Sequence, residues 1–194
     1  MKKTLFAAAL FVATATGAVS TAFAAPVSYK IDPAHTAVAF IVNHVGFSNV
    51  IGRFNTVGGE VSFDKDAVEK STVTVTIDTT SVDTNHAKRD EHLRSPDFFN
   101  AKEFPKMTFK STKIEKTGDK TGKLHGDLTM LGVTKPVVLD VTFNKDGVSP
   151  ASKLETAGFS ARGTVKRTEF GMKYGAPAIG DDIQLLIEVE AVKS

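Results

Sequence analysis

A regular alternation of apolar and polar side chains constrains the fold of this chain more than any other feature. It is clearest over residues 137–144, where Val137, Leu139, Val141 and Phe143 alternate with mostly polar neighbours. Successive side chains of a β-strand point to opposite faces of a sheet, so this pattern predicts strands with one apolar and one largely polar face. Similar runs predict further strands near residues 27–31, 38–44, 57–63, 72–77, 106–116, 124–130, 156–165 and 183–189.

Short turn signals separate many of these runs. They are Gly58-Gly59, Thr117-Gly118-Asp119, Gly132 and Asp146-Gly147. Such residues adopt the backbone angles of tight hairpins, and most neighbouring runs lack room for the crossover helix that a parallel sheet requires. We therefore predict an all-β fold, an antiparallel sandwich or barrel of about eight strands.

One long segment interrupts the strands. Residues 83–100 are polar and compatible with helix, and Asp83 or Thr84 is a suitable N-cap. Ser95-Pro96 is typical of a second N-cap followed by proline at the first helical position. We expect two short helices, forming a helical insertion near residues 84–100 that lies across the barrel. A second irregular stretch, residues 170–182, predicts a loop before the last strand.

The N-terminus has the pattern of a secretory signal peptide. Lys2 and Lys3 precede an apolar run from Leu5 to Val19, and Ala22-Phe23-Ala24 follows as a small-x-small cleavage site. We predict a signal peptide over residues 1–24, a single domain over residues 25–194, and export to the periplasm.

Composition excludes several classes of function. The chain has no cysteine, which excludes thiol chemistry and cysteine-ligated zinc. Once Lys2 and Lys3 are removed with the signal peptide, 22 basic side chains face 22 acidic ones. A chain without net positive charge or a basic tail lacks the usual footprint of a nucleic-acid-binding protein. We predict no nucleic-acid partner.

Motifs for catalysis and metal binding are missing from the sequence. The five histidines form no His-x-His or His-x-x-x-His pair. The run Gly118–Lys123 lacks the spacing of a phosphate loop and joins two predicted strands, and no Gly-x-Ser-x-Gly elbow exists. We predict no metal site, no cofactor and no enzymatic activity. A triad assembled only in space stays an alternative.

Phenylalanine is over-represented among the aromatic residues, with 14 Phe against two Tyr and no Trp. Phe47 and Phe54 flank a turn-like segment, residues 48–52, and Phe98 and Phe99 lie in the helical insertion. An ordinary core is one explanation. The other is a narrow apolar cavity, because barrels of about eight strands can hold one small ligand.

Several short motifs stand in an order that resembles the order found in a known family. They are Thr79-Thr80-Ser81-Val82-Asp83-Thr84-Asn85, Arg89-Asp90-Glu91-His92-Leu93-Arg94-Ser95, Asp97-Phe98-Phe99, Phe104-Pro105, Gly126-Asp127-Leu128-Thr129, Gly132-Val133-Thr134-Lys135-Pro136-Val137 and Phe170-Gly171-Met172. From about Tyr29 to Val192 the chain resembles the YceI-like proteins, whose domain is named for polyisoprenoid binding. The resemblance implies a lipocalin-like antiparallel barrel with an apolar interior for an isoprenoid chain, in an exported protein without established catalytic activity.

Two groups of candidate site residues follow. The expected apolar lining consists of Val38, Phe40, Val42, Phe47, Phe54, Val75, Ile77, Phe98, Phe99, Phe109, Leu128, Leu139 and Ile187. The expected contacts to a polar head group are His44, Arg53, Arg89, His92 and Arg94. For each of these five, a surface ion pair is the alternative interpretation.

The leading hypothesis is a periplasmic protein that transports or sequesters an isoprenoid lipid, such as an isoprenoid quinone or a prenyl phosphate. One alternative is an enzyme acting on such a lipid, with His44 or His92 as the base. Another is a stress-related secreted interaction protein whose barrel is only a scaffold. A homodimer and transient contact with a membrane stay open as hypotheses about partners.

Overall fold

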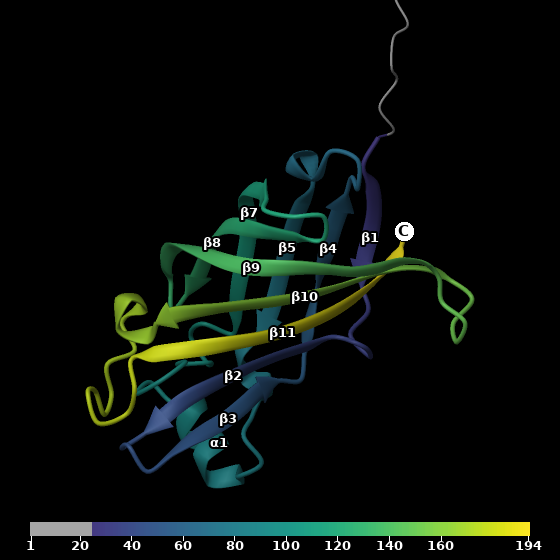
Figure 1. The fold of residues 1–194 in the computed structure, drawn as a ribbon. Helices are drawn as coiled ribbons and strands as arrows, with labels where there is room; N and C mark the ends of the chain where they lie inside the picture. The colour runs from purple at the N-terminus through teal and green to yellow at the C-terminus, as the bar shows by residue number, and fades with distance from the viewer. Residues whose placement is uncertain (1–24) are drawn as a thin grey trace, which may run out of the picture.

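The structure is a computed structural model that describes residues 25–194, so the predicted signal peptide lies outside the described residues. These residues form eleven β-strands, one α-helix and three short 3₁₀ helices (Figure 1). In chain order they are β1 Val27–Ile31, β2 Ala37–His44, β3 Ser48–Phe54, β4 Val57–Phe63, η1 Val68–Lys70, β5 Thr72–Asp78, η2 Thr79–Ser81, β6 Val82–Asp83, α1 Ala87–Arg94, β7 Lys106–Lys116, β8 Thr121–Met130, β9 Val133–Val148, β10 Glu155–Lys166, η3 Arg167–Phe170 and β11 Asp182–Lys193.

Eight of the strands close into an antiparallel barrel. Their order around the barrel is β1-β4-β5-β7-β8-β9-β10-β11, and β11 pairs with β1 to complete the ring. The closing register places Ile31 opposite Ala191. The structure thus confirms the predicted all-β fold and, of the two architectures that the turn signals allowed, it selects the barrel.

The remaining strands branch from β11. The last residues of β11 pair with β1, whereas Gln184–Glu188 pair with β2. β3 then adds to β2, and the two-residue β6 adds to β3. The prediction of a turn at residues 48–52 was therefore wrong. These residues are extended because β2 offers them a full antiparallel partner, which overrides their local turn preference.

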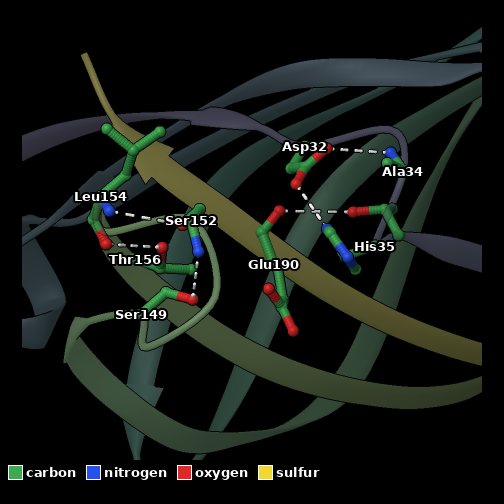
Figure 2. A network of polar contacts seen from close by, with 9 residues as sticks. Asp32, Ala34, His35, Ser149, Ser152, Leu154, Thr156 and Glu190 are labelled. Atoms are coloured by element: carbon green, nitrogen blue, oxygen red, sulfur yellow. Dashed lines mark hydrogen bonds and ion pairs between the residues drawn. The ribbon is translucent and has the colours of Figure 1, made fainter.

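The corner between β1 and β2 is held by a compact polar cluster (Figure 2). Asp32 accepts hydrogen bonds from the Ala34 N–H at 2.9 Å and from His35 Nδ1 at 2.7 Å. The Asp32 N–H donates to the Glu190 carbonyl at 2.9 Å, and the Thr36 hydroxyl donates to the same oxygen at 3.4 Å. Both strands are thereby anchored on β11.

Two of the predicted turns lie inside strands. Gly58-Gly59 belongs to β4, where a Cβ at Gly59 would lie 2.1 Å from the Thr74 carbonyl oxygen, so close approach of β5 requires the glycine. Asp146-Gly147 belongs to β9, and the chain reverses only over residues 149–154, which Figure 2 shows near the end of β11. The turns predicted at residues 117–119 and at Gly132 are confirmed.

The helical insertion contains one helix within the described residues. His86 is its N-cap, since Nδ1 accepts from the Arg89 N–H at 3.2 Å, and the predicted caps Asp83 and Thr84 lie further upstream. The predicted second helix is absent from the residues after α1, which form turns. The Phe99 N–H reaches back to the Leu93 carbonyl at 2.9 Å, so the chain folds onto the end of α1 instead of continuing.

The apolar faces of the strands point into the barrel, as the alternation predicted. Val38, Phe40, Phe109 and Leu139 are each at most 7% exposed and belong to one large cluster. In Figure 1, α1 lies at the end of the barrel opposite the start of β1. None of the helices in residues 25–194 is both long and apolar enough to cross a bilayer.

Candidate functional site

A cavity of about 620 Å³ occupies the interior of the barrel. Its walls extend from α1 at one end, where Arg89 and His92 line it, to the β7–β8 turn at the other, where Gly118 and Lys120 line it. The strand registers place these groups at opposite ends of β5, β7 and β8. The volume is typical of small-molecule sites, and a cavity that follows the strands suits an elongated guest.

The structure brings twelve of the thirteen predicted apolar residues together around this cavity. They are Val38, Phe40, Val42, Phe54, Val75, Ile77, Phe98, Phe99, Phe109, Leu128, Leu139 and Ile187. Several of them, including Val42 and Ile187, are only partly buried. Ile187 packs against the large apolar cluster and also lines the cavity, so the inner wall is partly core and partly the surface of an open space.

Phe47 is the thirteenth residue, and it does not line the cavity. It is 91% exposed and lies in the turn between β2 and β3. Its predicted place rested on the turn-like reading of residues 48–52. Because those residues form β3, Phe47 is displaced to the tip of a hairpin and points away from the barrel interior.

Aromatic rings cluster at both ends of the cavity. Near α1, the rings of Phe40 and Phe54 have centroids 5.7 Å apart, and Phe54 meets Phe99 edge-on at 5.3 Å. At the other end, Phe63 lies 5.2 Å from both Phe143 and Phe159. Aromatic pairs at these distances stabilise the fold by more than the burial of their apolar surface alone.

The second aromatic group was missing from the predicted lining, although the sequence contained a signal for it. Phe143 lies on the same face of β9 as Leu139, and Phe159 lies two residues before the inward-facing Ala161 of β10. The alternation therefore places both rings on the inner face.

Arg89 is the best-positioned cation at the α1 end. Its Nε donates to the Thr84 hydroxyl at 2.7 Å, and one terminal nitrogen donates to the Thr84 carbonyl at 2.8 Å. Thr84 is fixed in turn by Asp90, whose carboxylate accepts from the Thr84 N–H at 2.8 Å and from its hydroxyl. Thr84 and Asp90 are buried, whereas Arg89 is exposed and lines the cavity. The network thus orients a cation at the cavity wall.

His92 lines the same end and joins the helical insertion to the loop before β11. Its ring meets Phe98 and Tyr174 edge-on, with centroids 5.0 Å apart in each case, and Nε2 lies 2.9 Å from Asp97 Oδ2. His44 also lines the cavity, at the end of β2, where it forms an isolated bridge with Ile179.

The other two predicted head-group residues lie outside the cavity lining. Arg53 is on β3, with its guanidinium 3.8 Å from the carboxylate of Asp83, so the alternative of a surface ion pair describes it better. Arg94 donates to the Val82 carbonyl at 3.3 Å. The helix-compatible composition predicted a helix in this segment but did not determine which of its faces points to the cavity.

Arg167 is a buried cation that the predicted site residues did not include. It is 2% exposed and lines the cavity near Met172 and Tyr174. Its guanidinium donates to four carbonyl oxygens, those of Gly180 at 2.8 Å and of Met172, Tyr174 and Ile179 at 2.9 Å. Burial lowers the pKa of Arg167. Its main action is to hold the loop of residues 171–181 over this end of the barrel.

The opposite end of the cavity is also polar. Lys65, Lys116, Lys120 and Lys123 line it together with the acidic residues Asp66 and Asp119. Lys123 pairs with Asp140 at 2.7 Å. Within residues 25–194, no group of three or more His, Asp or Glu side chains is arranged to hold a metal ion. The geometry therefore offers an apolar channel with charged groups at both ends, cations at the α1 end and both signs at the other.

Comparison with known proteins agrees with this architecture. Protein YceI of Escherichia coli O157:H7 is 42% identical over 167 residues, which are 85% of this chain and 86% of the relative. The crystal structure of the Campylobacter jejuni YceI protein is 38% identical and superposes with a TM-score of 0.71, covering 78% of this chain and 90% of the other.

A more distant structure shares the fold. A domain from Saccharophagus degradans, described as a polyisoprenoid binding domain, has a TM-score of 0.66 at 14% identity and covers 87% of this chain and 99% of its own. The sequence profile of the YceI-like domain matches residues 29–191, almost the whole described region. The chain belongs to the family of YceI-like domain proteins.

Proposed function

We propose that this protein binds a long-chain isoprenoid lipid inside its barrel and carries or sequesters it without altering it chemically. The observation that carries the proposal is the cavity of about 620 Å³, whose walls are aromatic and aliphatic along their length and carry charged groups at both ends. The polyisoprenoid binding domain from Saccharophagus degradans, which shares the fold, supports the same class of ligand.

Burial of the lipid tail would supply most of the affinity. Each methylene group that leaves water for an apolar wall contributes about 0.8 kcal/mol. The ordering of a flexible chain and the loss of its free motion oppose this gain. A tail of several isoprene units therefore leaves a useful surplus, because its contribution grows with length while the cost of association is incurred largely once.

The basic groups at the α1 end would select the head group. Arg89 is held by Thr84 and lines the cavity, with His92 and His44 nearby. A guanidinium suits a phosphate, and an imidazole can donate to a quinone oxygen. We assign the head group to this end and the tail to the channel between Phe54 and Phe143.

The N-terminal sequence supports a proposal for the place of action. The charged start, apolar run and Ala22-Phe23-Ala24 motif support export and cleavage after Ala24. We propose that the mature protein begins at Ala25 in the periplasm of a Gram-negative host. N-terminal sequencing of protein from that host should start at Ala25, and a chain that still starts at Met1 would remove the argument for export.

Native mass spectrometry of the mature protein, purified without detergent, tests the binding function. A carrier should retain added mass that matches an isoprenoid lipid, and organic extraction should release that mass. Incubation with a labelled prenyl lipid should return the lipid unchanged. Recovery of a modified product would instead favour an enzyme, and an empty protein that takes up no prenyl lipid would favour a scaffold.

A further inference from the structure

The tip of the β2–β3 hairpin exposes two apolar side chains to solvent. Phe47 is 91% exposed and Val45 is 46% exposed. The turn also places Val45 at φ 58° and Gly46 at φ 78°. A β-branched residue rarely adopts a positive φ, and the usual residues here are Asn or Asp followed by Gly. The hairpin therefore carries both a strained valine and an unburied ring.

This apolar tip is fixed beside one end of the cavity. The Val45 N–H donates to the Ala178 carbonyl at 3.0 Å, and the Gly180 N–H donates to the Asn43 carbonyl at 2.9 Å. His44 and Ile179, which are joined by a bridge between the same two segments, both line the cavity. The tip thus lies at the α1 end of the channel.

The loop that meets the tip adds a second exposed aromatic ring. Tyr174 is 47% exposed, and its ring contacts His92 and Phe98 with centroids 5.0 Å and 5.3 Å away. An aromatic ring with one polar end is favoured at the boundary between membrane and water.

The surroundings of the tip carry more positive than negative charge. Residues 43–53 contain Arg53 and no acidic side chain, and residues 171–180 contain Lys173 and none. Helix α1 adds three Lys or Arg side chains against one exposed acid, Glu91, because its other acid is buried. Asp83 and Asp97 pair with Arg53 and His92, so the positive excess rests on Lys173 and on α1. A basic surface around exposed aromatic and aliphatic groups is complementary to an anionic lipid bilayer.

We propose that the β2–β3 tip docks on a phospholipid bilayer, with Val45 and Phe47 inserted at the boundary between head groups and acyl chains. Tyr174 and the basic side chains of α1 contact the lipid head groups. Docking in this way sets the α1 end of the cavity against the membrane, where an isoprenoid lipid resides. The consequence for loading rests on the proposed lipid-binding function, whereas the docking itself does not.

Co-sedimentation with phosphatidylcholine–phosphatidylglycerol vesicles tests the docking. Phe47→Ser should lower the partition coefficient about ten-fold, because one phenylalanine no longer leaves water. Leu154→Ser is the matched control, since Leu154 is 51% exposed but lies in the β9–β10 loop (Figure 2), and it should bind vesicles as the unmodified protein does. Added salt or vesicles of phosphatidylcholine alone should weaken binding.

A second variant guards against a trivial effect on folding. Val45→Asn removes an inserted side chain while placing at positive φ a residue that favours it. It should bind vesicles more weakly than the unmodified protein and melt at a higher temperature. Equal vesicle binding by the unmodified protein, Phe47→Ser and Val45→Asn would overturn the docking proposal.

Two further measurements distinguish membrane docking from self-association through the tip and from the proposed lipid-binding function. Sedimentation of the unmodified protein in solution should show a monomer, or an oligomer that Phe47→Ser leaves intact. Self-association that Phe47→Ser abolishes would assign the tip to a second copy of the chain and overturn docking. Titration with a water-soluble short prenyl phosphate should give equal affinity for the unmodified protein and Phe47→Ser. If neither protein binds it while vesicle binding still depends on Phe47, docking stands and the proposed lipid-binding function fails.

Discussion

The ring of Phe40 covers Gly52, its direct partner on the neighbouring strand, so closely that a Cβ atom at Gly52 would lie 2.3 Å from Cζ of that ring. A similar contact occurs between β7 and β8, where Gly126 lies diagonally opposite Phe109 and a Cβ at Gly126 would lie 2.3 Å from Cζ of that ring. Both rings line the cavity. Glycine on one strand therefore lets a large ring lie flat against the wall, which keeps the channel open.

Gly52→Ala should narrow the channel and weaken binding of a long lipid, with a moderate loss of stability. The added methyl group must push the end of the Phe40 ring toward the cavity, at a cost of about 1–3 kcal/mol for overpacking. Affinity for a long prenyl phosphate should fall by more than affinity for a short one. Chemical denaturation and binding titrations measure the two effects, and an unchanged affinity for the long lipid would show that the ring lies outside its path.

Phe40→Asp should destabilise the fold severely. The carboxylate would replace a ring that is 7% exposed and would have no partner in an apolar wall. Loss of the ring alone costs about 3–5 kcal/mol. Ile51→Asp is the control on the adjacent strand β3, because Ile51 is 65% exposed and its replacement should change stability by about 0.5 kcal/mol or less. Equal unfolding midpoints for both variants would contradict the assigned inner face.

Arg89→Ala and Arg94→Ala form a matched pair on one helix. Arg89 lines the cavity and Arg94 does not. A charge-assisted contact to phosphate contributes about 1.5–3 kcal/mol, so Arg89→Ala should weaken binding of a prenyl phosphate about ten- to a hundred-fold. Arg94→Ala should leave the affinity near that of the unmodified protein. Equal effects of the two changes in a binding titration would discard Arg89 as the head-group contact.

The pair of His35 and Asp32 should make stability depend on pH. The hydrogen bond that His35 donates to Asp32 raises the pKa of His35 above its ordinary value of 6.5 and lowers the pKa of Asp32 below 3.8. The stabilisation from His35 is thus complete below pH 6.5 and is lost as the pH rises through the raised value, while that from Asp32 is lost as the pH falls through the lowered one.

The pair of His35 and Asp32 should therefore stabilise the fold most at pH values between the ordinary pKa values of Asp32, 3.8, and His35, 6.5. The difference in unfolding midpoint between the unmodified protein and His35→Gln should be largest at about pH 5 and should shrink at about pH 9. The same difference at both pH values would show that the ion pair at the β1–β2 corner does not titrate as the geometry implies.

The alternation of side chains predicted the strands and their inner faces because it reports a local property, the face on which each residue lies, and it left a sandwich and a barrel both open. Val38 and Ile77 could be placed on the inner wall for that reason, and Phe143 carried the same signal. Phe47 could not be placed, because whether residues 48–52 form a turn or a strand depends on their pairing with β2, which lies outside the segment itself.

The polar residues at the ends of the cavity were less predictable, because their positions depend on contacts with distant segments. Arg167 acts through four carbonyl groups of a loop that follows it, and no spacing in the sequence indicates such contacts. Arg89 and Arg94 were equivalent candidates until the contacts of Thr84 and Val82 distinguished them. Local periodicity therefore gives the wall of the channel, and tertiary contacts decide which cations reach it.

Binding titration with prenyl phosphates of increasing length is the most direct test of the claim that the tail lies in the barrel. Each added isoprene unit should strengthen binding by about ten-fold or more until the channel of about 620 Å³ is filled, after which the affinity should level off. Graded affinity followed by a plateau is the predicted result. Equal affinity for all lengths would contradict the account, because it would mean that the lipid is held only by its head group outside the barrel.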